Sequence, residues 1–106
     1  MRSNLQQAIS ELKRDIAGLY GDRLFHMALF GSHARGEAGA DSDVDILVVL
    51  KGSVRPFDEI ERTGEIVSRI SLKYDFVLSC TFMDEDRYLT RNGPLLRNIR
   101  REGVAI

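Results

Sequence analysis

The chain has 106 residues, of which 43% are hydrophobic and 29% are charged, with a formal net charge of −1. This length predicts one domain over residues 1–106, and the balanced charge argues against direct binding of a nucleic-acid backbone as the main task. The single cysteine excludes an intramolecular disulfide and favours a reducing compartment. A polar N-terminus without a signal-peptide pattern, and no apolar run long enough to span a bilayer, predict a cytoplasmic protein without a membrane segment.

Hydrophobic periodicity predicts helices and strands in alternation along the chain. A capping box of Ser3 and Gln6 marks the first helix, and Pro94 and Gly103 bound the last one. This pattern is typical of a small α/β or α+β domain in which helices cover a mixed sheet, and it leaves hairpin-like and crossover pairing of the strands open. The expected elements are a helix over 5–19, a strand over 24–30, a strand over 44–50, a loop over 51–57, a helix over 58–72, a strand over 74–82 and a closing helix over 94–102.

Two carboxylates open the strand predicted over residues 44–50. Asp43 and Asp45 are two residues apart, so their side chains are expected on the same side of the strand. Neighbouring carboxylates repel and raise one another's pKa unless a cation lies between them. A hard divalent ion such as Mg²⁺ or Mn²⁺ resolves the repulsion, and Mg²⁺ commonly takes one or two carboxylates together with substrate phosphate.

A Gly-Ser turn precedes this pair. Gly31 ends the strand over 24–30, and Ser32 begins a stretch, SHAR, that can form the first turn of a short helix. Backbone N–H groups at a helix start bind phosphate, glycine permits a close approach, and serine adds a hydroxyl donor. The sequence therefore predicts a phosphate site and a metal site on adjoining elements.

Gly31 and Ser32, then ten residues, then Asp43, one residue and Asp45 form a pattern that resembles the signature of the nucleotidyltransferase superfamily that includes DNA polymerase β. The fuller string GSHARG…SDVDILV resembles the minimal nucleotidyltransferases of that superfamily. The resemblance covers nearly the whole chain, and it implies a nucleotidyltransferase-like mixed sheet with a final short strand after the closing helix.

The resemblance also implies roles for individual residues. Asp43 and Asp45 would bind Mg²⁺ or Mn²⁺, and Gly31 and Ser32 would hold the β- and γ-phosphates of a nucleoside triphosphate such as ATP. Asp75, expected on the polar face of the strand over 74–82, would be the third carboxylate, binding a second metal or taking the acceptor's proton. Further candidates are Arg35, as a phosphate contact or an exposed helix residue, and Ser42, which shapes the loop before Asp43. His26 and His33 lack a metal-binding spacing and are interpreted as structural or surface residues.

The acceptor of the nucleotide is expected to be, or to be brought by, another protein, because residues 1–106 contain no second acceptor-binding domain. The resemblance implies an antitoxin paired with a helical HEPN-type toxin that receives AMP on a hydroxyl. Alternatives are a non-catalytic antitoxin that acts by docking, transfer to a small molecule such as an aminoglycoside, and self-association that completes the site. A P-loop NTPase is excluded because no lysine follows a glycine-rich loop.

Overall fold

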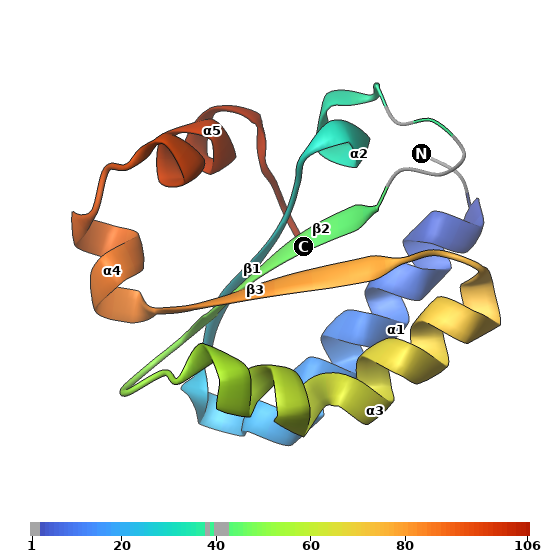
Figure 1. Ribbon diagram of the computed structural model, residues 1–106, viewed down its shortest axis with the longest axis horizontal. Helices are drawn as coiled ribbons and strands as arrows, with labels where there is room; N and C mark the ends of the chain where they lie inside the picture. Colours follow the sequence, from blue (N-terminus) through green and yellow to red (C-terminus); the bar gives the residue numbers. More distant parts are fainter. Residues whose placement is uncertain (1–2, 38, 40–42) are drawn as a thin grey trace.

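The computed structural model of the protein describes residues 3–37, 39 and 43–106. Helices and strands alternate along this part of the chain, as the hydrophobic pattern predicts (Figure 1). None of the described helices is long and apolar enough to cross a membrane. In chain order the elements are α1 (Ser3–Tyr20), the 3-10 helix η1 (Gly21–Arg23), β1 (Leu24–Phe30), α2 (Ser32–Arg35), β2 (Val44–Leu50), α3 (Pro56–Tyr74), β3 (Leu78–Asp84), α4 (Glu85–Thr90), α5 (Pro94–Glu102) and β4 (Val104–Ala105).

The strands form one mixed sheet in the order β3-β2-β1-β4. β1 is antiparallel to both β2 and β4, whereas β2 and β3 are parallel. Both kinds of connection that the sequence left open are therefore present: β1 and β2 pair as antiparallel neighbours joined by a connection that contains α2, and α3 is the crossover between the parallel strands β2 and β3. The prediction of a mixed α+β sheet flanked by helices, including a last short strand, is confirmed.

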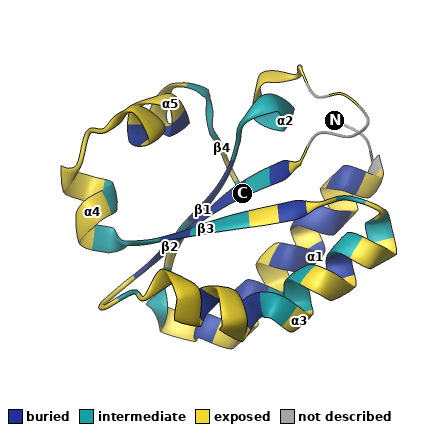
Figure 2. Cartoon of the chain, viewed as in Figure 1, coloured by how far each residue is buried: buried dark blue, intermediate teal, exposed yellow. Residues whose placement is uncertain are grey.

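The main hydrophobic core lies between one face of the sheet and the helices α1 and α3. Leu12 and Ile16 of α1 and Ile70 of α3 are fully buried against alternate residues of β2, among them Ile46 and Val48. The other face is covered less completely, by α5, whose Ile99 packs against Ala28, Leu47 and Val49. Figure 2 shows the strands buried along much of their length and the helices buried along the sides that face the sheet. Asp45, near the start of β2, lies on this second face together with Leu47 and Val49.

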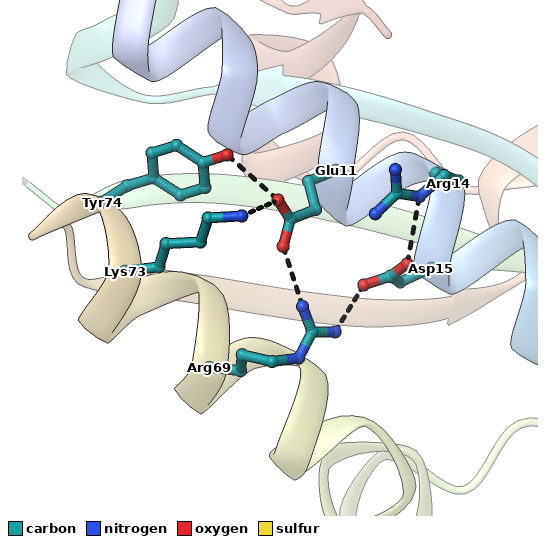
Figure 3. Close-up of polar contacts among 6 residues, drawn as sticks. All are labelled: Glu11, Arg14, Asp15, Arg69, Lys73 and Tyr74. Atoms are coloured by element: carbon teal, nitrogen blue, oxygen red, sulfur yellow. Dashed lines mark hydrogen bonds and ion pairs between the residues drawn. The ribbon is translucent and has the colours of Figure 1, made fainter.

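Ion pairs join α1 to α3 outside this core (Figure 3). Glu11 of α1 accepts hydrogen bonds from Arg69 and Lys73 at 2.8 Å each and from the Tyr74 hydroxyl at 3.0 Å. Arg69 also donates to Asp15, so one guanidinium bridges two carboxylates one helical turn apart. The hydrogen bond from Lys73 is the main reason that the pKa of Glu11 is lowered although its side chain is largely buried.

The strand predicted over 74–82 begins four residues later than expected. Helix α3 continues through Tyr74, and Asp75 ends it in the left-handed conformation, with φ 59° and its N–H donating to Ser71 O. Leu78 is the first residue of β3. Asp75 therefore caps a helix and does not lie on the polar face of a strand, so that expectation is wrong.

Two smaller differences come from local capping. Pro56 starts α3 in its first turn, so the predicted loop over 51–57 ends earlier. Helix α4 was not predicted; its N-cap is Asp84, whose carboxylate accepts from the Arg87 N–H at 2.7 Å. The predicted capping box rests on the side chain of Ser3, which lies outside what the structure describes.

Candidate active site

Antiparallel pairing brings the Gly-Ser turn and the carboxylate pair to the same end of the sheet. β1 ends at Phe30, whose partner across the ladder is Asp45 near the start of β2. Gly31 follows Phe30 directly and is the N-cap residue of α2. Two motifs separated by ten residues in the sequence are therefore neighbours in the fold, as the sequence predicts.

The backbone of Gly31 and the carboxylate of Asp45 are in close contact. Gly31 has φ 76° and ψ −158°, a conformation that is essentially restricted to glycine. An ideal Cβ built on Gly31 would overlap Asp45 Oδ2 and would lie 3.3 Å from its Cγ. The Asp45 carboxylate thus occupies the space that any other residue at position 31 would need.

The carboxylate pair lies on the less covered face of the sheet. Alternation along β2 places Asp45 on the same face as Leu47 and Val49, and Asp43 two residues earlier belongs to the same row. Asp43 is exposed and Asp45 is half-buried. Burial, and secondly the charge of Asp43, raise the pKa of Asp45, while the charges of His33 and Arg35 act in the opposite direction.

This arrangement fits a divalent cation. Burial and the neighbouring charge of Asp43 both disfavour the ionised form of Asp45, and a bound cation would favour that form. Oxygen donors of this kind suit Mg²⁺ or Mn²⁺, which take one or two carboxylates and keep other positions for phosphate and water. Asp43 and Asp45 are the residues that would hold it.

Asp75 does not complete a three-carboxylate cluster. Within the described residues, no group of three His, Cys, Asp or Glu side chains is close enough together to hold a metal ion. Asp75 is exposed at the end of α3, although it lies at the same end of the sheet, since the Val44 N–H donates to Val77 O at 2.8 Å. The structure brings Gly31, Asp43 and Asp45 together, and it places Asp75 at the same end of the sheet but in no three-residue metal-binding group of the described residues.

Arg35 is ion-paired with two carboxylates in the structure. Its guanidinium lies 3.0 Å from Glu37 and 3.4 Å from Glu102, the last residue of α5. These carboxylates, Glu37 first, raise the pKa of Arg35. Glu102 therefore connects the closing helix to the residues beside Asp45, a link that the sequence did not reveal.

Two kinds of residue near the pair were missed by sequence reasoning. His33 has no metal-binding spacing, yet a positive charge on its ring lowers the pKa of Asp45, and the ring meets Phe76 edge-on at 6.2 Å between centroids. Ser79 is the partner of Asp45 in the parallel β2–β3 ladder, and Thr81 is the partner of Leu47, so both hydroxyls lie on the face of the carboxylates. Their register depends on strand pairing that no local pattern specifies.

Ser42, a predicted site residue, lies outside the described residues.

Comparison with known proteins decides the family. The model of the family described as "Nucleotidyltransferase domain" matches residues 9–105. The chain belongs to the nucleotidyltransferase domain family. The membership that the resemblance of the sequence implies is therefore confirmed.

Two relatives of this nucleotidyltransferase come from Methanocaldococcus jannaschii. "Putative protein adenylyltransferase MJ0141" is 41% identical over 73 residues, which are 69% of this chain and 73% of the relative. "Putative protein adenylyltransferase MJ0604" is 33% identical over 101 residues, 94% of this chain and 95% of the relative.

Two solved structures share the fold. A toxin-antitoxin structure with AMP-PNP has a TM-score of 0.63 at 22% identity, covering 94% of this chain and 70% of the matched chain. A tri-AMPylated Shewanella oneidensis HEPN toxin in complex with MNT antitoxin has a TM-score of 0.55 at 20% identity, covering 96% and 67%. At these identities the likeness establishes the nucleotidyltransferase fold.

Replacing Gly31 is expected to disturb both the backbone and Asp45. Gly31→Ala forces alanine into a conformation that costs about 1–3 kcal/mol and also displaces the Asp45 carboxylate. Gly36→Ala is the matched control, because Gly36 also has a positive φ, 73°, but no atom lies within 4 Å of its ideal Cβ. Urea unfolding should show Gly31→Ala as clearly the more destabilised variant; equal losses for the two variants would contradict the contact.

The metal-free protein is expected to become more stable when Asp45 is neutralised. The folded-state pKa of Asp45 is raised above its ordinary 3.8. At pH values between 3.8 and that raised pKa, the folded protein therefore binds more protons than the unfolded chain. Stability from this group therefore falls as pH rises through that window, and the full penalty is present above it. Asp45→Asn should raise the melting temperature at pH 7 in EDTA, with the gain shrinking toward pH 3.8. A gain that is the same at both pH values, or a loss at pH 7, would contradict the electrostatic account.

Proposed function

We propose that this nucleotidyltransferase transfers AMP from ATP to a hydroxyl group on a partner protein, with Mg²⁺ or Mn²⁺ as its cofactor. The observation that carries the proposal is the contact of the Gly31 backbone with the Asp45 carboxylate, next to Asp43. This contact puts the Gly-Ser turn, where the phosphates would bind, next to a carboxylate pair that a cation would stabilise. The names of the two Methanocaldococcus jannaschii relatives support adenylyl transfer to protein.

Different residues of the chain would bind different parts of the metal–triphosphate complex. Asp43 and Asp45 would hold the metal ion, which when bound supplies charge neutralisation and polarises the phosphate oxygens. Gly31 and the Ser32 hydroxyl would take the β- and γ-phosphates at the start of α2. Arg35 would exchange its carboxylate partners Glu37 and Glu102 for phosphate oxygens, since its planar guanidinium can pair with either kind of anion.

The transfer itself is a displacement at phosphorus. The acceptor oxygen forms a bond to the α-phosphorus, the bond from that phosphorus to the bridging oxygen breaks, and pyrophosphate leaves. The hydroxyl proton passes to a nearby base. Asp75 is our candidate for that base or for a second-metal ligand, because it lies at the same end of the sheet. The chain contributes mainly positioning and charge neutralisation.

The proposed partner is a mostly helical, HEPN-type toxin, which would make this nucleotidyltransferase the antitoxin of a cytoplasmic pair. Support comes from the two structural neighbours, one a toxin-antitoxin complex with AMP-PNP and the other an AMPylated HEPN toxin with its MNT antitoxin. The half-buried carboxylate of Asp45 against Gly31 favours catalysis over docking alone, because a pure docking module has no need of two carboxylates that repel each other.

Transfer is expected to depend on the carboxylate pair. The chain would be incubated with labelled ATP, Mg²⁺ and the product of the neighbouring gene, and each added AMP should raise the partner's mass by about 329 Da, as transfer at the α-phosphorus requires. Asp43→Asn and Asp45→Asn should each reduce the rate by about a thousandfold or more. The exposed Asp22, at the opposite end of β1, is the control, and Asp22→Asn should match the wild type.

Other outcomes of this experiment would replace the proposal. A partner that stays unmodified but is inhibited equally by wild type and Asp43→Asn would make the chain a docking antitoxin. Rapid transfer to a free aminoglycoside would make a small molecule the acceptor. Asp75→Asn tests the third carboxylate, since asparagine tolerates the left-handed conformation at the end of α3; turnover equal to wild type would remove Asp75 from the site.

A further inference from the structure

The outer edge of β3 is available for backbone pairing. β3 is the end strand of the sheet, and among the described residues no strand pairs with its outer side (Figure 1). Val77 O accepts from β2, while the Leu78 N–H turns away from β2 to Ser71 Oγ at 3.3 Å. Alternation along a parallel strand then turns the N–H and C=O groups of Cys80 and Phe82 to the outer edge.

This edge lacks the features that usually prevent pairing. Edge strands are commonly protected by lysine, proline or a bulge, but residues 78–83 contain no charged residue and no proline, and the register of β3 with β2 is continuous. An unprotected edge of this length is a template for one more strand.

An uncharged groove runs beside the same edge. It has a volume of about 360 Å³, and every residue that lines it is uncharged. Its walls include Ile60, Gly64 and Val67 of α3 and Cys80 and Phe82 of β3. Ile60 is 52% exposed, and no atom lies within 4 Å of an ideal Cβ on Gly64. The groove has the size and chemistry to take apolar side chains.

The edge is also next to the active site. Ser79 of β3 is the ladder partner of Asp45, and its exposed hydroxyl lies on the same face as the carboxylate pair. A strand added to β3 would lie about 5 Å from β3 and about 10 Å from β2. A long side chain on it can extend over Ser79 toward Asp45, whereas a short one would stop above β3.

We propose that the protein segment carrying the acceptor hydroxyl binds in an extended conformation as an added strand along β3. A tyrosine of that segment would reach over Ser79, and because successive residues of a strand point to opposite faces, its two neighbours would enter the α3–β3 groove. The chemistry of the groove calls for apolar neighbours. This inference rests on the proposed function, since it names where the acceptor of that reaction binds.

The test uses the full chain, Mg²⁺-ATP and a nine-residue peptide with a central Val-Tyr-Val sequence. Amide hydrogen exchange of Cys80 and Phe82, whose N–H groups point outward, should slow about tenfold or more at saturating peptide. Ser79 and Thr81, whose amides face β2, serve as internal controls. Gly64→Arg should weaken peptide affinity about tenfold or more by filling the groove, Gly64→Ala should change it less than about twofold, and both should bind Mg²⁺-ATP as the wild type does.

Each other result overturns the inference. The first such result is unchanged amide exchange at Cys80 and Phe82 with peptide bound, and the second is no peptide binding at millimolar concentration. The third is a Gly64→Arg variant that binds the peptide as tightly as the wild type does. The fourth is protection of Cys80 and Phe82 that appears without peptide and grows with protein concentration. The last would assign the edge to a second copy of the chain. Protection at the edge with no AMP on the tyrosine would reject the proposed function and keep the binding surface, while transfer without protection would do the reverse.

Discussion

The candidate active site depends on the contact between the Gly31 backbone and the Asp45 carboxylate. It requires a glycine-only conformation after β1, an antiparallel register that pairs Phe30 with Asp45, and the start of a helix directly after the turn. Each requirement restricts the others, because a shift of one residue in the register would turn Asp45 to the other face of the sheet. One steric relation thus fixes the relative positions of the turn, the carboxylate pair and α2.

The site has an energetic cost that the rest of the domain must offset. Asp45 is partly desolvated and lies close to the charge of Asp43, which disfavours its ionised form in the absence of a cation. The stabilising interactions lie elsewhere: in the core between the sheet and α1 and α3, and in the ion pairs of Glu11 and Asp15 with Arg69. It is common for residues away from a functional site to provide the stability that offsets unfavourable charge within the site.

The sequence predicted the parts of the site that local chemistry determines. The Gly-Ser turn, the spacing to Asp43 and the strand after it are short-range features, and the structure places Gly31, Asp43 and Asp45 at one end of the sheet. Asp75 was misplaced because the alternation from Tyr74 to Phe82 fits a strand as well as a helix end followed by a strand. The left-handed tolerance of aspartate was the signal that favoured the helix end. Ser79 and Glu102 were not recognised, because their relation to the site depends on strand order and on the packing of α5.

The central claim is that the fold disfavours the ionised form of Asp45 by burying it beside Asp43, and that a bound divalent cation removes this penalty. The most direct measurement is a carbon NMR titration of the Asp45 side-chain carboxyl, in EDTA and again with Mg²⁺ and a non-hydrolysable ATP analogue. The account predicts a metal-free pKa above the ordinary 3.8, and a lower pKa once the ion is bound. An ordinary pKa that does not respond to Mg²⁺ would contradict it.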